Sequence, residues 1–568
     1  MTTEPDPATE PDAATEPEPG LAAGILDALL RENFAGLADR IDRTDPSAPA
    51  LHLPAHPPLP LEPDGFLTDL RLQRPASLTL ADVNAALQAL ADPEDEDGVR
   101  AFAQECRQAL AALDLRQRES WRLARRAPLP GGRGLDGLLA FDALAATQPH
   151  PAYPTSAVRL GFTDADTLAY APEYRPEFAL HWVAIPRDQL TRPQNPPQWW
   201  PRPSDVGLPV VLDGEHDLFP VHPLTARREL SQALNEVGLP AAQLIAPGTH
   251  LKVAPTLSTR TVAVKSQPGL HLKLPLPTST LGRLNRRSLG PGTLADGALV
   301  RAVVTSARAA RLLLADESHY AHAGHPFLGY LMRRFPDGLD RCHVVPIAAL
   351  LAPGRGPDLV IEELARQYGD GTVAGLFRDY LDLLFGVAVH LFVRYGIALE
   401  SHQQNAALVL DPDGPLRLLV KDFDGALIHH PRLTRAMPGA PGVARFADPR
   451  LLTGSDDALA DVFITITVHL GAGALAFGLA RAGRARLPEL LDLIRGALTR
   501  AVDRYPGHPA AAVLRARALE ADRLPGKTML TAGTLMTKAR SGASDINKCY
   551  GTTGPNYLAV RRLAGVPT

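Results

Sequence analysis

Two polar segments interrupt apolar runs in the C-terminal half of the chain. Residues 400–405 read Glu-Ser-His-Gln-Gln-Asn, and residues 421–425 read Lys-Asp-Phe-Asp-Gly. The runs AALVL and LRLLV between them predict two strands, and the intervening DPDG predicts a hairpin turn. Because a hairpin brings its outer ends together, we expect Asn405 to lie close to Asp422. Amide and carboxylate oxygens held in this way can bind Mg²⁺, with phosphate oxygens completing the coordination shell.

The same segments predict contacts to a nucleotide. His402 and Gln404 can contact phosphate or ribose, and Asn405 and Asp422 are the predicted metal ligands. His402 taken alone is more typical of an ordinary helix end, whereas the whole His-x-x-Asn and Asp-Phe-Asp set favours function. Protein kinases hold Mg²⁺ through a similar Asn and Asp. Glu400 stands five residues before the Asn, where a kinase carries its catalytic Asp, and this argues for another use of ATP.

Two upstream segments combine hydroxyl and basic side chains. PTLSTRTVAV and HLKLPLPTSTLGRLNRR are predicted to contain strands, and they carry Ser258, Thr259, Arg260, Lys273, Ser279, Thr280, Arg283 and Arg286. Ser258 and Arg260 are predicted to point to one side of their strand. Arginine forks and a lysine ammonium suit a polyphosphate. A solvated basic face of a sheet explains these segments equally well when they are taken alone, and neither common glycine-rich phosphate loop is present.

The elements that must position these residues change along the chain. Helical spacing over 21–47 and 80–126, separated by a Pro-rich connector at 51–63, predicts a small helical domain ending near 135, with a hinge at 129–134. Short apolar runs between Pro and Gly turns predict strands over 136–290, including a hairpin at the QPG of 267–269. Helical periodicity returns from about 296 and is longest over 373–399. The chain is therefore predicted to be a multidomain α+β protein.

Composition narrows the class of protein. The net charge of −4 gives no general reason to expect nucleic-acid binding, and three widely separated cysteines predict free thiols in a reducing cytoplasm. Residues 1–20 hold six acidic and no basic residues, which predicts a disordered acidic tail rather than a signal peptide. Residues 462–480 are apolar enough to resemble a membrane span. Because no second span accompanies them and they include His469, we predict a buried core helix and no membrane association.

A third segment allows a family to be suggested. QPHPAYPTSAVRLGF (148–162), followed by YAPEY (170–174), predicts a rigid, proline-restricted loop. With FPVHPL (219–224), PTLSTRT, ESHQQN and KDFDG, it forms a series of motifs in order over roughly 140–560. This series resembles the NRPS-independent siderophore synthetases of the aerobactin-synthetase-like IucA/IucC family. In chain order, these segments match the His-Pro-x-His-Pro, Pro-Val-His-Pro, Ser-x-Arg-Thr, His-x-Gln-Asn and Asp-Phe motifs of the family.

The resemblance implies a fold and an activity. The fold would be a cupped hand, with a helical thumb at 21–135, β-rich ATP-binding fingers at 136–370 and a kinase-like palm of helices and strands at 371–568. The enzyme would be an ATP-dependent carboxylate–amine ligase, using ATP and Mg²⁺ in the cytoplasm as a homodimer. It would adenylate citrate or a citryl or other dicarboxylate derivative, release pyrophosphate, and then transfer the acyl group to an amine, polyamine or amino alcohol, releasing AMP. Such chemistry needs charge stabilisation and positioning but no protein nucleophile.

The resemblance also implies roles for individual residues. The family positions for nucleotide binding are His150, Ser258, Arg260, Lys273, His402, Asn405 and Asp422. Residue type adds Thr259, Thr280, Arg283 and Gln404 to this set, and an arginine within 283–286 is expected to contact ATP. We expect the catalytic groups to be His150, Arg260, Lys273 and His402. Arg159, Lys527, Lys538 and Arg540 are predicted to bind the substrate carboxylates, although a solvated basic helix end explains the last three equally well.

The sequence departs from the family pattern near the His-Pro loop. Tyr153 stands in place of the second His, Ala157 in place of a Lys, and Leu224-Thr225 where the family often has Trp-Gln. These changes predict either a loop rebuilt for a different acid or a slow enzyme. Two alternatives therefore stay open: a small-molecule kinase with a divergent catalytic loop, and a catalytically weak binding homologue.

Overall fold

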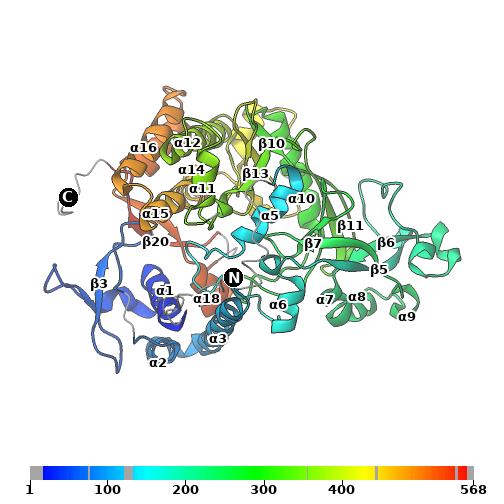
Figure 1. Cartoon of the computed structure of the whole chain (residues 1–568), viewed down its shortest axis with the longest axis horizontal. Coiled ribbons are helices and arrows are strands. Elements are labelled where there is room, and N and C mark those ends of the chain that lie inside the picture. Colours follow the sequence, from blue (N-terminus) through cyan, green and yellow to red (C-terminus); the bar gives the residue numbers. More distant parts are fainter. Residues whose placement is uncertain are drawn as a thin grey trace, which may run out of the picture.

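The structure is a computed structural model that describes residues 17–73, 77–120, 132–354, 356–441, 445–543 and 548–559. Its N-terminal lobe, blue in Figure 1, contains helices α1 (Pro17–Arg31), α2 (Leu80–Leu90) and α3 (Glu96–Arg118). A capping box of Thr79 and Asp82 starts α2. The predicted disordered tail is wrong for residues 17–20, which form the first turn of α1; residues 1–16, and 129–131 of the predicted hinge, lie outside the described residues.

A small antiparallel sheet completes this lobe. Its strands are β1 (Ile41–Asp42), β2 (Ala50–Leu51), β3 (Leu59–Pro63) and β4 (Leu70–Leu72), in that order. Helical structure predicted to reach residue 47 therefore ends with the 3₁₀ turn Phe34–Arg40. The Pro-rich connector contains a turn at 54–56, and its last residues pair as β3 because leucines at alternate positions enter the core.

The middle of the chain forms a seven-stranded antiparallel sheet, here called the middle sheet, with order β11-β12-β9-β8-β7-β5-β6. Its strands are β5 (Phe178–Pro186), β6 (His216–Val221), β7 (His250–Pro255), β8 (Thr261–Val264), β9 (Leu270–Lys273), β11 (Asp316–His325) and β12 (Leu328–Arg334). The hairpin predicted at 267–269 is confirmed, since it joins β8 to β9. Because side chains alternate along a strand, His271 and Lys273 of β9 face the same side of the sheet.

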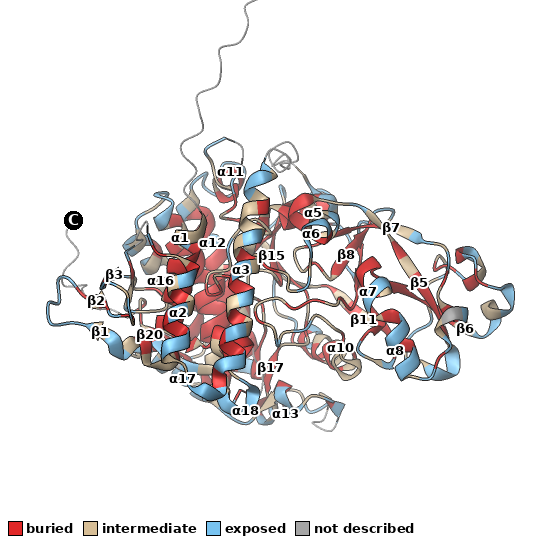
Figure 2. Cartoon of the chain, turned by 90° about the horizontal axis from the view of Figure 1, so that it is seen from below, coloured by how far each residue is buried: buried red, intermediate tan, exposed pale blue. Residues whose placement is uncertain are grey.

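The C-terminal lobe packs helices around a four-stranded sheet of order β10-β16-β15-β13. The strands are β10 (Leu312–Leu314), β13 (His343–Pro346), β15 (Ala406–Leu410) and β16 (Arg417–Val420). Helix α12 (Val373–His390) continues through a π turn to Tyr395 and ends at Gly396, whose φ of +68° suits glycine. β15 of this sheet is largely buried, and so is β8 of the middle sheet, as Figure 2 shows.

The predicted core helix is confirmed. Asp456–Arg481 is a continuous helical segment and is long and apolar enough to cross a membrane. In the structure, 94% of its most apolar window is buried against other parts of the protein, so its apolar character is accounted for by the core of this lobe.

The C-terminal part of the chain returns to the N-terminal lobe. Leu530 and Leu535 lie in the same hydrophobic core as the helices of that lobe, together with Tyr153. Both oxygens of buried Glu32 at the end of α1 accept hydrogen bonds, from the N–H groups of Leu530 (3.0 Å) and Thr531 (2.8 Å). The lobe is therefore built from segments far apart in the sequence.

Candidate active site

The predicted hairpin is present and brings the two polar segments together. β15 and β16 pair antiparallel with Ala406 opposite Val420, and the N–H of Lys421 donates to the carbonyl oxygen of Asn405 at 3.0 Å. The amide nitrogen of Asn405 donates to the carbonyl oxygen of Glu400 at 3.2 Å, which directs the amide oxygen away from that bond. Asn405 and Asp422 therefore lie side by side at one end of the hairpin.

Lys273 reaches this end of the hairpin from the middle sheet. Its ammonium group donates to Asp422 Oδ1 at 2.7 Å and to Asp424 Oδ2 at 3.0 Å, and its side chain is only 2% exposed. Burial acts to raise the pKa of Asp422, but the charges of Lys273 and Arg333 hold that pKa well below its usual value. Burial and the neighbouring Asp422 raise the pKa of Asp424. A cation already lies between the two carboxylates.

These donors fit Mg²⁺. The ammonium of Lys273 shows that the two carboxylates converge on one cation, and carboxylate and amide oxygens are ligands that Mg²⁺ accepts. No group of three His, Cys, Asp or Glu side chains suited to a metal occurs among the described residues, so phosphate oxygens and water would complete the shell. The hairpin brings Asn405 and Asp422 to the same end, and Asp424, which the sequence prediction did not include, shares the Lys273 ammonium with Asp422.

Ser258, Thr259 and Arg260 form the turn between β7 and β8, so the expectation that they lie along a strand is wrong. Thr259 has a φ of +64°, and the Ser258 hydroxyl donates to the hydroxyl oxygen of Thr261 at 2.9 Å. Arg260 donates to the carbonyl oxygen of Ser288 at 2.6 Å. Its charge also acts to lower the pKa values of the Asp422–Asp424 pair, so the turn still presents a cation to the site.

Arg287, one residue beyond the predicted 283–286, is coupled electrostatically to Asp422 and Asp424. Burial and the charge of Arg260 lower the pKa of Arg287 to about 9, while Asp422 and Asp424 oppose that shift. By contrast, Arg283 Nε donates to the carbonyl oxygen of Thr534 at 3.2 Å, and Arg286 lies 5.6 Å from the ring centre of Phe327.

The motif could not distinguish these arginines, because they lie in a loop whose path the residue types do not define. Thr280 lies in the same loop, where its N–H donates to Asn285 O at 3.4 Å.

Two predicted histidines come together with Lys527. Burial, followed by the charges of His402 and Lys527, lowers the pKa of His150 to about 3; burial and Lys527 lower the pKa of His402 to about 4. Both rings are therefore neutral at pH 7. Nδ1 of His150 accepts the Ala152 N–H (3.1 Å) and Nδ1 of His402 accepts the Gln404 N–H (3.3 Å). The proton of each ring is then on Nε2, which can donate to an anionic ligand.

The predicted substrate-binding residues are not all in one place. Arg159 makes a two-pronged ion pair with Glu173 (2.9 and 2.8 Å) and donates to the Thr259 hydroxyl. Arg540 pairs with Glu94 and Asp95 of the N-terminal lobe, each at 3.0 Å. Lys538 is exposed on the short helix α18 (Lys538–Ser541). Among these four predicted residues, Lys527 is the one whose charge acts on both site histidines.

Tyr153, one of the departures from the family pattern, belongs to a buried structural network. It is fully buried, and its hydroxyl donates to Glu105 Oε1 at 2.8 Å. The hydroxyls of Thr155 (2.6 Å) and Thr534 (2.8 Å) donate to the same carboxylate. Burial raises the pKa of Glu105 against the effect of these bonds. The aromatic residue therefore joins α3, the His-Pro loop and the C-terminal segment instead of facing a ligand.

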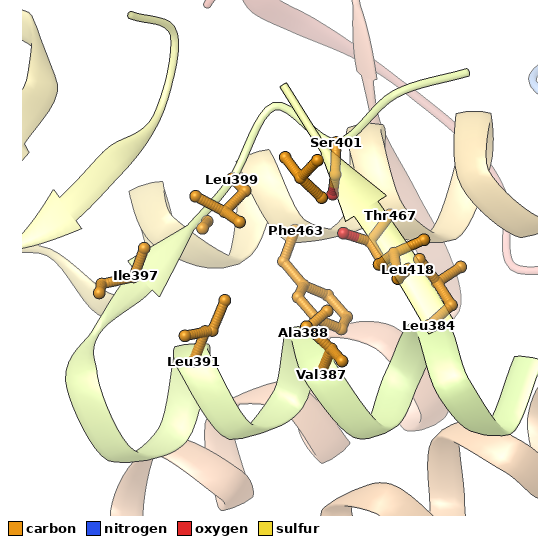
Figure 3. A pocket seen from close by; sticks show the side chains of 12 residues that line it. Leu384, Val387, Ala388, Leu391, Ile397, Leu399, Ser401, Leu418, Phe463 and Thr467 are labelled. Atoms are coloured by element: carbon orange, nitrogen blue, oxygen red, sulfur yellow. The ribbon is translucent and has the colours of Figure 1, made fainter. Parts of the chain in front are cut away.

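A cavity beneath the hairpin is lined almost entirely by apolar side chains (Figure 3). Ser401 and Thr467 are its two polar lining residues, and their oxygens point toward each other in that view. None of the predicted nucleotide-binding residues lines it. The cavity is therefore lined by the apolar residues that pack α12 and the helical segment Asp456–Arg481 against β16.

Comparison with known proteins gives matches over two long segments of the chain. Residues 138–352 match the IucA / IucC family model, and residues 376–542 match the model of the ferric iron reductase FhuF-like transporter. Aerobactin synthase of Escherichia coli is 27% identical over 311 residues, 49% of this chain and 53% of that protein. The 2-[(L-alanin-3-ylcarbamoyl)methyl]-3-(2-aminoethylcarbamoyl)-2-hydroxypropanoate synthase of Staphylococcus aureus is 26% identical over 333 residues, 52% of this chain and 53% of that protein. These matches span about half the length of both relatives.

Solved structures show that the fold extends over nearly the whole chain. Aerobactin synthetase IucC of Klebsiella pneumoniae has a TM-score of 0.70 at 19% identity, covering 95% of this chain and 98% of that one. The ATP-bound aerobactin synthetase IucA of the same organism has a TM-score of 0.70 at 17% identity, covering 95% of this chain and 100% of that one. In sequence, residues 138–352 are similar to the IucA / IucC family, and the fold of the chain is that of the two aerobactin synthetase structures.

Proposed function

We propose that the protein is an ATP-dependent siderophore synthetase that adenylates a carboxylate and condenses it with an amine or hydroxyl. The observation that carries the proposal is the meeting of Lys273 from the middle sheet with Asp422 and Asp424 from the C-terminal lobe. Arg260 and Arg287 flank this point with two further positive charges. A partly buried group of three cations and two carboxylates suits a polyphosphate that carries its own metal ion.

Each residue has a role in this chemistry. Lys273, Arg260 and Arg287 would offset charge on the phosphates as pyrophosphate leaves. Mg²⁺, held by Asn405, Asp422 and Asp424, would neutralise phosphate oxygens and align the leaving group. His150 and His402 would donate from Nε2 to phosphate or to the carboxylate under attack, without becoming charged.

The remaining predicted contacts of Ser258, Thr259, Thr280 and Gln404 with the nucleotide stay part of this proposal. So do Arg283 as a further nucleotide contact, the catalytic roles of the histidines, and the binding of substrate carboxylates by Lys527, Arg159, Lys538 and Arg540.

The proposal extends to the acid, the amine and the architecture. A relative from Staphylococcus aureus that is 25% identical over about half of each chain is an L-2,3-diaminopropanoate–citrate ligase, which supports citrate or a related polycarboxylate as the acid. We propose that the N-terminal lobe, the middle sheet and the C-terminal lobe act as thumb, fingers and palm of a cupped hand, with ATP between fingers and palm. The protein would act in the cytoplasm as a homodimer.

The decisive experiment measures which nucleotide product forms. The purified protein is incubated with ATP, Mg²⁺ and a panel of citrate and other di- and tricarboxylates, with hydroxylamine as the acceptor. We expect acid-dependent pyrophosphate and AMP, and a hydroxamate identified by mass spectrometry. Formation of ADP and a phosphorylated product would instead establish the kinase alternative. Nucleotide binding without any acid-dependent hydroxamate across the panel would establish the binding homologue.

A further inference from the structure

The backbone at Asp422 is held in an unfavourable conformation. Its φ of +67° places it in the left-handed region, which costs free energy for a residue with a Cβ and is tolerated best by Asn and Asp. Such conformations persist at functional sites because the surrounding structure holds them in place. Lys273 binds only the carboxylate of Asp422 and makes no contact that would hold its backbone in this conformation. Other residues must therefore hold the backbone.

Glu317 and Arg333 hold this backbone from the middle sheet. The N–H of Asp422 donates to Glu317 Oε1 at 3.0 Å, and Arg333 Nε donates to the same oxygen. Arg333 Nη2 lies 3.8 Å from Asp422 Oδ2. The side chains of Glu317, on β11, and Arg333, on β12, are each 2% exposed. The pair therefore contacts Asp422 at both its backbone and its carboxylate.

This pair differs from Lys273 in what it can do once a nucleotide is bound. Two of the three N–H donors of the Lys273 ammonium bind Asp422 and Asp424, and the third is left for a phosphate oxygen, so a bound nucleotide would share this cation with the two aspartates. The Glu317–Arg333 pair is buried behind Asp422 and depends on no ligand. Arg333 Nη2 is buried without a hydrogen-bond partner in the described part of the chain, so it has a donor left for Asp422.

We propose that Glu317 and Arg333 are positioning residues that preset Asp422 to receive the metal ion of a Mg²⁺–nucleotide complex. The inference rests on the proposed function only in that Asp422 is taken as a ligand of the nucleotide's metal. It adds the mechanism by which a strand pair of the middle sheet sets the geometry of a residue in the C-terminal lobe. The pair touches neither nucleotide nor substrate and acts through Asp422.

The test is the gain in ATP affinity on adding Mg²⁺, measured by titration calorimetry with Mg²⁺ or with EDTA and without any acid substrate. Glu317→Gln, Arg333→Met and the double variant are compared with wild type. Asp217→Asn is the matched control: Asp217 is also buried and paired with arginines, Arg187 and Arg192, but lies on β6 at the opposite edge of the sheet. Thermal unfolding of every variant is recorded alongside.

We expect each single variant to lose about tenfold of the Mg²⁺-dependent gain while affinity in EDTA stays within about twofold. The double variant leaves no unpaired buried charge, so its thermal stability should recover relative to the single variants, while the Mg²⁺-dependent gain stays low. Asp217→Asn should keep the wild-type gain.

The proposal is overturned if the double variant recovers the gain together with its stability, or if folded single variants keep it. Absence of any gain in the wild type would overturn it as well. A wild type that shows the gain but adenylates no acid would remove the proposed function and leave the positioning role standing.

Discussion

Two carboxylates join distant parts of this chain, the buried Glu105 and the partly buried Asp422, and they differ in the donors that surround them. Glu105 accepts three hydrogen bonds from neutral hydroxyls, whereas Asp422 is held by the cations Lys273 and Arg333. Burial accordingly raises the pKa of Glu105, while the cations keep the pKa of Asp422 well below its usual value. The hydroxyls around Glu105 only partly offset the effect of burial on its pKa, whereas the cations around Asp422 more than offset it.

The largest expected effect on activity comes from removing Asp422, the carboxylate that cations surround. Asp422→Ala should lower kcat/KM for acid-dependent pyrophosphate release by about 10³-fold or more, because the metal and Lys273 lose their shared partner. The far-ultraviolet circular dichroism should stay that of the wild type. Turnover close to wild type would remove Asp422 from the active site.

Removing Glu105, the carboxylate that neutral hydroxyls surround, should lower stability and leave ATP affinity nearly unchanged. Glu105→Ala leaves the hydroxyls of Tyr153, Thr155 and Thr534 without their acceptor and should reduce the free energy of unfolding by about 3 kcal/mol. Denaturant unfolding measures this loss. ATP affinity of the folded fraction should stay within about twofold of wild type. A larger loss of affinity with unchanged stability would mean that Glu105 belongs to the binding machinery.

The adjacent residues Arg286 and Arg287 allow the same comparison within one loop. Arg287→Met should weaken ATP binding by about tenfold or more, because it removes a charge-assisted donor beside the Asp422–Asp424 pair. Arg286→Met is the matched control, since Arg286 lies over the ring of Phe327 and should leave affinity nearly unchanged. Titration calorimetry with ATP compares the two. Equal losses in both variants would contradict the assignment of Arg287.

The smallest effect concerns the pH dependence of stability. The pKa of Glu105 is raised in the folded state, so the unfolded state releases this proton first and stability falls as pH rises from about 4.5 through the folded-state pKa. Glu105→Gln removes that loss. Its melting temperature relative to wild type should therefore rise by about 1–2 °C between pH 4.5 and pH 8. A difference that stays constant across this range would show that Glu105 titrates normally.

Several elements could be predicted because their signals are local. The DPDG turn between two apolar runs identified the β15–β16 hairpin, and the QPG turn identified the β8–β9 hairpin. From the first hairpin alone, Asn405 and Asp422 were expected to be neighbours, and the Asn405 carbonyl accepts the Lys421 N–H beside them. The buried helix over 462–480 followed from its apolar composition and the lack of a second span.

Other features could not be predicted, because they depend on contacts between segments far apart in the chain. Arg286 and Arg287 are adjacent and chemically identical, and only the path of their loop decides which of them faces Asp422. Arg540 and Arg159 looked like ligands for carboxylates and indeed bind carboxylates, but these belong to Asp95 and Glu173. Residue type predicts that these arginines bind carboxylates, but it does not specify these two partners within the protein.

The sequence by itself determined the chemistry that this protein can carry: an Asn and two Asp residues at the ends of one hairpin, basic residues on two upstream segments, and histidines set among prolines and amides. These are properties of residue type and short spacing, which survive without knowledge of the fold. The tertiary structure decided which charges meet. Packing the middle sheet against the C-terminal lobe buries Lys273, Glu317 and Arg333 around Asp422, and buried charges must be paired. Because these charges must be paired, residues more than a hundred positions apart in the sequence, such as Lys273 and Asp422, meet in one site.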